Sequence, residues 1–264
     1  MEIKRTRAAY YGLVEWFDRL IGTVIDALYE HGLMENTVII YTSDHGDFLG
    51  SHSLTGKGPA TYDEITRIPF IVRQPNLAAK GAVYEHPVSH IDVVPTMLEY
   101  MGLHIPRLLE GTSMIDTFRN PSDRCRDKAF IEFTRYEIDH DDFGGFQPLR
   151  AVYDGRYKLT INLLSSDELY DLTEDPEEMT NLIDSTGHVE IRNRLHDRIL
   201  EQMNDTRDPF RGYYWERRPW RDDAAPPTWS YTNMTRQREN EEYEPRQLDY
   251  STGLEMEKAV RKKS

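Results

Sequence analysis

Cysteine is almost absent from this sequence, because Cys125 is the only one among 264 residues. An intramolecular disulfide is therefore excluded, and so low a cysteine content is typical of a reducing compartment. Long apolar runs are absent too: no stretch approaches the ~20 residues that a membrane-spanning helix needs. The first residues, MEIKRTRAAYYG, lack the apolar core of a secretory signal. We therefore expect no membrane partner and a cytoplasmic location.

Positive charge is also scarce. The 32 Lys and Arg residues are outnumbered by 46 Asp and Glu residues, which gives a net charge of -14. Proteins that bind nucleic acids gain affinity by clustering Lys and Arg against phosphates, so this balance argues against a nucleic-acid partner. An anionic substrate would have to meet local positive charge and not the overall field of the protein.

The first part of the chain has the pattern of an α/β fold. Apolar residues recur at helical spacing over residues 10–28 and predict an amphipathic helix. The short runs 37–41 and 68–72 are typical of strands buried on both faces. Another helix is expected after Asp92 as its N-cap, with Gly102 ending it. The order of these elements favours part of a mixed sheet sandwiched by helices.

The pattern changes after residue 118. Residues 128–133 and 167–172 have the composition of strands, and residues 150–162 predict a hairpin whose turn is Asp154-Gly155. Residues 189–203 have helical spacing. We therefore expect a small α+β subdomain with an antiparallel sheet and one helix over 119–207. It would follow the end of a larger α/β domain, 1–118, and precede an extended aromatic and charged arm, 208–264.

The loop TSDHGDFLGSHSLTGKG, residues 42–58, joins charged side chains to the end of a predicted strand. Ligand sites in open α/β sheets are built at this end of the strands. Asp44 and His45 can offer a carboxylate oxygen and a ring nitrogen to one cation, and Lys57 can reach an anion as a point charge. Taken singly, a strand-exit turn and a solvated surface lysine are the commoner explanations.

Several segments, in order, resemble the sulfatase family of the alkaline-phosphatase-like superfamily. They are YYGLVEWFDRLIGTVIDAL, IIYTSDHGDFLGSHSLTGKGPATYDEITRIPFIVRQPN, SHIDVVPTMLEYMG and LYDLTEDPEEMTNL. The resemblance covers residues 7–182 and implies the C-terminal half of a sulfatase, which hydrolyses a small sulfate ester. A phosphonate monoester or phosphodiester hydrolase of the same superfamily and a catalytically inactive interaction module are the alternatives.

The resemblance also implies roles for individual residues. Asp44 and His45 match ligands of a divalent cation, for which calcium is expected and magnesium or manganese are alternatives. Lys57 matches the catalytic lysine that holds the sulfate and stabilises the leaving oxygen. His52 and Arg67 are weaker candidates for substrate binding. A cation and a lysine aimed at the oxygens where negative charge develops stabilise the transition state more than the ground state.

One family motif is missing from the sequence. The family's nucleophile is a formylglycine made from Cys or Ser in a C-x-P-S-R type motif, whereas Cys125 lies in SDRCRDKAF, which has neither the proline nor the final arginine. The isolated chain is therefore expected to be inactive. Its expected partner is the N-terminal half that carries the motif, and the arm suggests a homo-oligomer as another.

Overall fold

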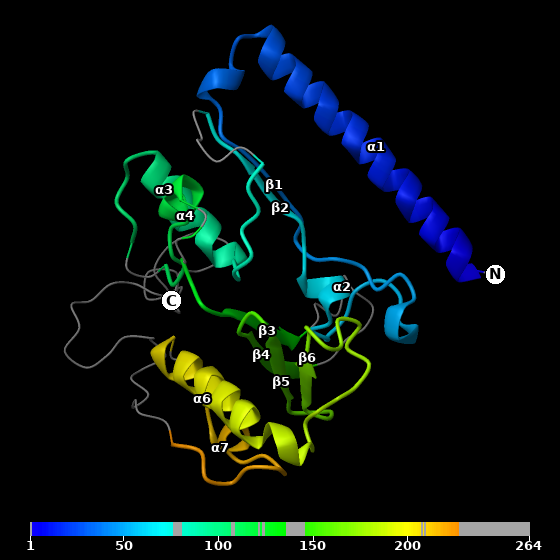
Figure 1. Ribbon diagram of the computed structural model, residues 1–264, viewed down its shortest axis with the longest axis vertical. Coiled ribbons are helices and arrows are strands. Elements are labelled where there is room, and N and C mark those ends of the chain that lie inside the picture. The colour runs from blue at the N-terminus through cyan, green and yellow to red at the C-terminus, as the bar shows by residue number, and fades with distance from the viewer. Residues whose placement is uncertain are drawn as a thin grey trace, which may run out of the picture. The chain divides into compact units, whose positions relative to one another are not determined.

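The structure is a computed structural model that describes residues 2–75, 81–106, 109–120, 122, 125–135, 146–206, 208 and 210–226. The chain divides into two compact units, Met1–Val83 and Tyr84–Ser264, and each is described by itself (Figure 1). The boundary expected between residues 118 and 119 stays a prediction. Most of the expected arm lies outside the described residues.

The first unit contains a long helix, a pair of strands and short helical turns. In chain order they are α1 (Glu2–Glu30), η1 (Met34–Asn36), β1 (Ile39–Thr42), η2 (Ser51–Ser53), α2 (Asp63–Thr66) and β2 (Phe70–Arg73). The helix predicted over 10–28 is confirmed, and it is longer at both ends.

The apolar stripe of α1 is exposed. Five of its members, at helical spacing, are 42–61% exposed: Leu13, Val14, Phe17, Leu20 and Val24. The spacing therefore predicts the helix correctly, but no described residue covers this face as it would in a packed layer. Among the described residues, no helix is both long enough and apolar enough to cross a membrane.

The two strands of the first unit pair with each other in antiparallel orientation. Ile39 lies opposite Arg73, and Thr42 lies opposite Phe70. The expectation that both strands are buried on both faces is wrong for the described residues, because their side chains are half-buried or exposed. Their apolar composition predicts burial, but no described layer covers both faces of the pair. The α/β class itself is confirmed.

The second unit begins with short helices and continues into a four-stranded antiparallel sheet in the order β3-β4-β5-β6. Its elements are η3 (His90–Asp92), α3 (Val93–Tyr100), α4 (Ile115–Arg119), β3 (Ala129–Arg135), β4 (Phe146–Tyr153), β5 (Tyr157–Asn162), β6 (Glu168–Asp171), η4 (Thr186–His188), α6 (Val189–Asp205) and α7 (Tyr213–Glu216). The antiparallel sheet and the helix predicted over 189–203 are confirmed.

Asp92 organises the segment before α3. Its side chain is fully buried and accepts hydrogen bonds from the backbone N–H of Ser89 at 3.0 Å and of Thr112 at 2.8 Å, and it pairs with Arg126. Asp92 lies at the N-cap position of α3 as expected, but the prediction that its side chain caps this helix is wrong. Asp92 completes a capping box with Ser89 around η3, and its carboxylate makes no cap bond to α3.

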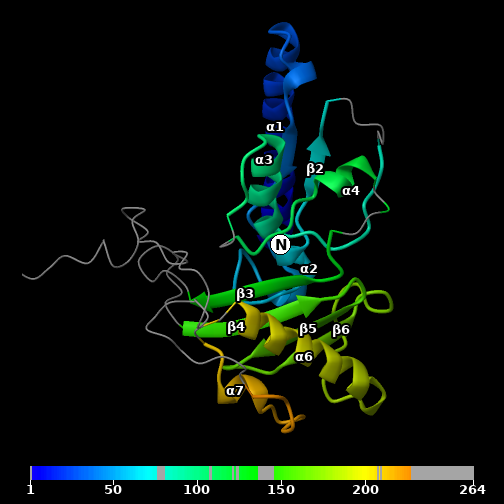
Figure 2. The ribbon, with the colours of Figure 1, turned by 90° about the vertical axis from the view of Figure 1, so that its left-hand side faces the viewer.

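Helix α6 packs across one face of the sheet and forms the main core (Figure 2). Leu195, Ile199 and Met203, spaced four residues apart, are buried against Leu159 and Leu169 of the strands. The side chains of a helix lie on one face at this spacing, while alternate strand residues point to the same side of a sheet. The apolar side chains of the helix and of the strands therefore pack against each other in one layer.

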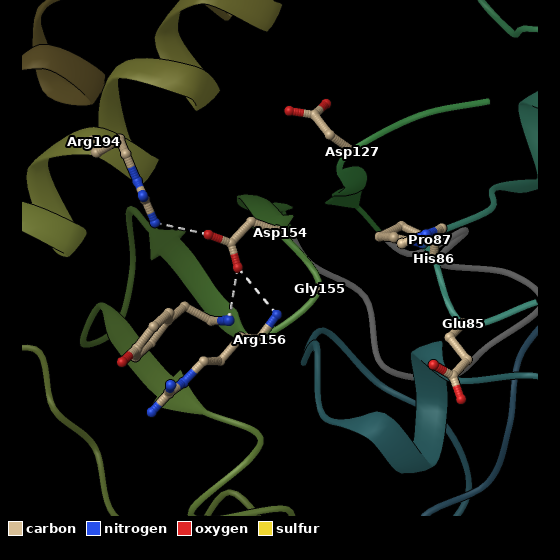
Figure 3. Close-up of a pocket in the computed structure, with 9 residues that line it drawn as sticks. Glu85, His86, Pro87, Asp127, Asp154, Gly155, Arg156 and Arg194 are labelled. Carbon is tan, nitrogen blue, oxygen red and sulfur yellow. Dashed lines mark hydrogen bonds and ion pairs between the residues drawn. The ribbon is translucent and has the colours of Figure 1, made fainter. Parts of the chain in front are cut away.

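The predicted hairpin between β4 and β5 is confirmed. Gly155 has φ +98°, a conformation that disfavours side chains with a Cβ. Asp154 Oδ1 accepts hydrogen bonds from the backbone N–H of Arg156 at 3.1 Å and of Tyr157 at 2.8 Å, and its Oδ2 accepts one from Arg194 on α6 at 2.9 Å (Figure 3). The turn is thereby fixed to the helix that covers the sheet.

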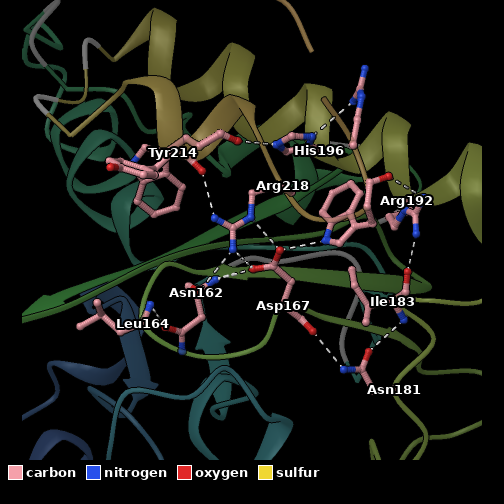
Figure 4. A network of polar contacts seen from close by, with 12 residues as sticks. Asn162, Leu164, Asp167, Asn181, Ile183, Arg192, His196, Tyr214 and Arg218 are labelled. Carbon is pink, nitrogen blue, oxygen red and sulfur yellow. Dashed lines mark hydrogen bonds and ion pairs between the residues drawn. The ribbon is translucent and has the colours of Figure 1, made fainter. Parts of the chain in front are cut away.

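Residues 210–226 pack onto the second unit through a buried polar network (Figure 4). Asp167 accepts two hydrogen bonds from Arg218, at 2.7 and 2.8 Å, one from the indole N–H of Trp220 at 2.9 Å, and one from the backbone N–H of Asn162 at 3.0 Å. Trp215 is almost fully buried in the core. This part of the expected arm is therefore packed, and it contains the short helix α7.

His196 should make the second unit acid-sensitive. Its Nε2 donates to the carbonyl of Trp215 at 2.7 Å. Burial lowers the pKa of His196 from 6.5 to about 4; Arg221 lowers it further, whereas the hydrogen bond to Trp215 and the carboxylates of Asp197 and Asp167 oppose the change. Between these values the unfolded chain binds a proton that the folded chain does not. The contribution of His196 to the free energy of unfolding is therefore fully present above pH 6.5. It should be lost, by at most about 3 kcal/mol, as the pH drops towards 4.

Urea unfolding at a series of pH values measures this effect, and His196→Gln, which keeps a side-chain donor, is the comparison. The variant should have a flatter pH dependence than the parent chain between pH 6.5 and 4. Equal slopes would show that other groups cause the acid sensitivity.

Candidate functional site

The candidate site begins where β1 ends. The hydroxyl of Ser43 donates to the carbonyl of His45 at 2.8 Å, and the backbone N–H of His45 donates to Asp44 Oδ1 at 2.9 Å. That N–H bond is the main reason why the pKa of Asp44 lies below its usual value. Asp44 is therefore held as an ionised, exposed carboxylate at the end of the strand.

The ring of His45 is oriented by the backbone. Its Nδ1 lies 2.7 Å from the carbonyl oxygen of Gly46, and because a carbonyl oxygen only accepts, Nδ1 carries a proton and donates it. In the neutral ring Nε2 then has the lone pair, and this atom lies 3.5 Å from Asp44 Oδ2. A backbone carbonyl that fixes the tautomer in this way is the usual support of a metal-binding histidine.

Asp44 and His45 fit a divalent cation as two of its ligands. One oxygen and one imidazole nitrogen side by side suit several divalent metals, and do not select one of them. The described residues contain no group of three or more His, Cys, Asp or Glu side chains that could hold a metal ion. The described part of the chain therefore offers a pair of ligands, and assignment of the pair to a metal stays a prediction.

Gly46 allows the loop to approach α2 closely. Its backbone N–H donates to the carbonyl of Ile65 at 2.9 Å, and a Cβ at this position would lie 1.8 Å from the carbonyl oxygen of Glu64. Any side chain would therefore push the loop away from α2. The same displacement would move the carbonyl that orients His45.

Gly46→Ala should destabilise the first unit by about 1–3 kcal/mol, the usual cost of overpacking. Thermal unfolding followed by circular dichroism measures the effect. Gly12→Ala is a matched control, since Gly12 lies in α1 with nothing within 4 Å of its Cβ position. An equal response of the two variants would contradict the close approach at Gly46.

The loop that follows is strained and anchored. Leu49, His52 and Ser53 have φ values of +47°, +49° and +62°, and such conformations cost about 1–3 kcal/mol each in residues other than glycine. Phe48, only 2% exposed, fixes the start of the loop, and its backbone N–H donates to the carbonyl of Gly56 at 2.9 Å. Strain held by a buried anchor is common at functional sites.

His52 stacks on Tyr62. The two rings are nearly parallel, with centroids 3.8 Å apart, and His52 Nε2 lies 3.8 Å from Glu64 Oε2. The side chain of His52 is mostly buried by these contacts. The sequence singled out His52 but gave no sign of this stacking, because Tyr62 lies ten residues away across an irregular loop.

Lys57 and Arg67 are both exposed. Lys57 lies between Gly56, which has φ +70°, and Gly58, so the backbone there is compatible with a bent loop. Arg67 follows α2 and forms a 3.6 Å ion pair with Asp63 on the surface. The structure therefore brings Asp44 and His45 into contact, and gives His52 and Arg67 local partners; the roles of these residues in binding and catalysis stay predictions.

Comparisons with known proteins identify the family. The sulfatase family model matches residues 2–103, a range that includes the whole candidate site. The uncharacterized sulfatase YidJ of Escherichia coli K12 is 44% identical over 245 residues, which cover 93% of this chain and 47% of YidJ. An arylsulfatase of Clostridium perfringens is 30% identical over 211 residues, which cover 79% of this chain and 42% of that protein.

A solved structure of a related hydrolase has a similar fold. The phosphonate monoester hydrolase of Agrobacterium radiobacter superposes with a TM-score of 0.65 at 29% identity, over 74% of this chain and 40% of that one. The chain spans less than half the length of these three proteins. With the family model, two sulfatases and the fold in agreement, the chain belongs to the sulfatase family.

Proposed function

We propose that this chain supplies the cation-binding and sulfate-binding residues of a sulfuric ester hydrolase. The observation that carries the proposal is the pairing of Asp44 Oδ2 with His45 Nε2 at 3.5 Å, at the end of β1. Both atoms are electron donors in the tautomer that Gly46 selects, so they favour a bound cation.

The residues would divide the work of ester cleavage. Asp44 and His45 would hold the cation, for which calcium is proposed and magnesium or manganese are alternatives; when bound, it would stabilise negative charge on the sulfuryl oxygens. Lys57, exposed between two glycines, would bind the sulfate and stabilise the leaving oxygen. His52, fixed by Tyr62, and the exposed Arg67 are proposed to contact the substrate.

The nucleophile would come from outside these 264 residues. Sulfatases generally use a formylglycine and a divalent cation, and the environment of Cys125 does not match the motif for that modification. We infer that the complementary part of a sulfatase, in the same or a separate polypeptide, carries it. The proposed substrate is a small sulfate ester and the proposed location is cytoplasmic; a homo-oligomer is the alternative association.

Reconstitution tests the catalytic proposal. The purified chain is mixed with the part of Escherichia coli YidJ that lies outside the matched region, modified to formylglycine, and assayed with p-nitrophenyl sulfate and added calcium, magnesium or manganese. The mixture should hydrolyse the ester, and the chain alone should not. Lys57→Ala should lower the rate of the mixture by about 10²–10³-fold, the usual effect of losing one group that stabilises the developing oxyanion.

The matched control is Arg119→Ala, which removes an exposed arginine that pairs with Asp116 on α4. It should leave the rate unchanged. Turnover by the chain alone, abolished by Lys57→Ala, would overturn the proposal that the nucleophile lies elsewhere. Activity of the mixture that is insensitive to Lys57→Ala would remove this lysine from the mechanism.

Cation binding is tested separately, without turnover. Terbium luminescence of the chain should reveal a weak site, because two ligands provide little charge. Asp44→Asn should weaken it further, and Asp18→Asn on the exposed surface of α1 should not. Equal binding by the two variants would contradict the assignment of Asp44.

A phosphonate monoester hydrolase is the second candidate. It is favoured by the structural similarity to the Agrobacterium radiobacter enzyme, whose TM-score is 0.65. The same reconstituted mixture should then hydrolyse p-nitrophenyl phenylphosphonate faster than the sulfate. A mixture that associates but cleaves neither ester would instead favour an interaction module without catalytic activity.

A further inference from the structure

The second unit contains a polar pocket that has no part in the proposed hydrolysis. It has a volume of about 360 Å³ and is lined by Glu85, His86, Pro87, Asp127, Asp154, Gly155, Arg156, Tyr157 and Arg194. Its size lies in the lower part of the roughly 300–1,000 Å³ range of small-molecule sites. None of its lining residues belongs to the candidate site in the loop over residues 42–58.

One side of the pocket is a fixed pair of arginines. Asp154 holds Arg194 at 2.9 Å and shapes the turn that carries Arg156 (Figure 3). Arg156 Nε and Nη2 bind both oxygens of Asp171 at 2.6–3.1 Å. The side chains of Arg156 and Arg194 are still 49% and 54% exposed, so each can donate further hydrogen bonds into the pocket.

The other side carries acceptors. Figure 3 shows Glu85, His86 and Asp127 across the pocket from Arg194 and Arg156. Asp127 Oδ2 lies 3.2 Å from Arg198 Nη2, and Asp127 Oδ1 lies 3.7 Å from Lys128 Nζ. About half of the Asp127 side chain is exposed. Glu85 is exposed as well. Donors on one side therefore face acceptors on the other.

The charges around the pocket cancel. Four carboxylates and four bases form the pocket and its supporting ion pairs: Glu85, Asp127, Asp154 and Asp171 with Lys128, Arg156, Arg194 and Arg198. A sulfate or carboxylate ligand would meet three lining carboxylates, and an ammonium ligand would meet two lining guanidiniums. Like charges brought together in this way disfavour both kinds of ion.

We propose that this pocket binds an uncharged saccharide. Sugar hydroxyls both donate and accept, so they can donate to Glu85 and Asp127 and accept from Arg156 and Arg194. The rings of Tyr157 and His86 supply apolar surface beside these groups. Prior fixing of the arginines by Asp154 and Asp171 lowers the entropy lost on binding. Binding here does not depend on the role in ester hydrolysis proposed for residues of the first unit.

The test is a titration of the full chain, labelled with nitrogen-15, with methyl β-D-glucopyranoside and methyl β-D-galactopyranoside. At least one should cause saturable shifts in the amide signals of residues 154–157 and in the Nε signal of Arg194. Arg194→Met should weaken binding at least ~5-fold, and Glu85→Gln, which leaves the hairpin contacts intact, should weaken it in the same direction. Arg19→Met, on the surface of α1, should have no effect.

Sodium glucuronate, glucosamine and glycerol serve as comparison ligands. All three should bind more weakly than the better neutral glycoside. No saturable shift with either glycoside, tighter binding of glucuronate or glucosamine, a response to glycerol equal to that of the sugars, or unchanged binding by both pocket variants would each overturn the proposal.

Discussion

Lys158→Met should lower the unfolding free energy of the second unit by ~3–5 kcal/mol, the usual cost of leaving one member of a buried ion pair without its partner. Lys158 on β5 and Glu178 in the turn after β6 lie 2.8 Å apart, and each side chain is 1% exposed. Neither water nor salt can screen the remaining carboxylate. Glu178→Met should be similarly destabilising, because it leaves the buried ammonium.

The double variant, Lys158→Met with Glu178→Met, should recover most of the loss, because a buried ion pair is often no more stabilising than packed apolar side chains. Arg119→Met is the surface control in the same unit: Arg119 pairs with Asp116 at 3.0 Å, but both side chains are mostly exposed. It should cost less than about 1 kcal/mol. Urea unfolding followed by tryptophan fluorescence in a Trp16→Phe background measures all four. A single-variant loss no larger than that of the control would contradict the buried charge.

Asp167→Ala should release residues 213–226 from the second unit and lower its unfolding free energy by ~3–5 kcal/mol. The substitution removes the partner of Arg218, which is only 11% exposed, together with the acceptor of the Trp220 indole. Trypsin should then cut faster after Arg217, which is followed by Arg218, since the protease needs the segment to detach from the fold. Timed digestion analysed by mass spectrometry locates the cuts.

Asp167→Asn keeps a neutral acceptor oxygen, so its unfolding free energy and its rate of cleavage should lie between those of the parent chain and of Asp167→Ala. Asp223→Ala is the matched control, because Asp223 is exposed and pairs with Arg221 at 3.0 Å at the edge of the same segment. It should leave the cutting rate after Arg217 unchanged. Equal protection of the bond between Arg217 and Arg218 in the Asp167→Ala variant and the parent chain would show that apolar packing of Trp215 holds the segment without the network.

The elements with strong local signals could be predicted from the sequence. The helix over 189–203 follows from apolar residues at spacings of four, and the β4–β5 hairpin follows from Asp154-Gly155, since both signals act over a few residues. The pair Lys158–Glu178 could not be predicted, because a lysine in a strand gives no indication of a partner twenty residues later. The exposure of β1 and β2 was not predicted either. Their apolar composition predicts that they are buried, but it does not say which other segments of a protein would cover them.

The candidate site was predictable in part. The contact between Asp44 and His45 follows from adjacency and from the strand that precedes them. The stacking of His52 on Tyr62 and the close approach of Gly46 to α2 depend on how an irregular loop folds back on itself, and no periodic pattern encodes that path. The saccharide pocket was missed because its residues come from four separate segments of the second unit.

The exposed stripe of α1 makes the melting behaviour of this chain depend on its surroundings. A partner that binds the folded helix through this stripe, and has no affinity for the unfolded chain, adds a free energy that grows with the logarithm of its concentration. The apparent melting temperature of the first unit would then rise with the concentration of such a partner. Its thermal stability would then report how much of such a partner is present, and each tenfold increase in free partner above its Kd would add about 1.4 kcal/mol.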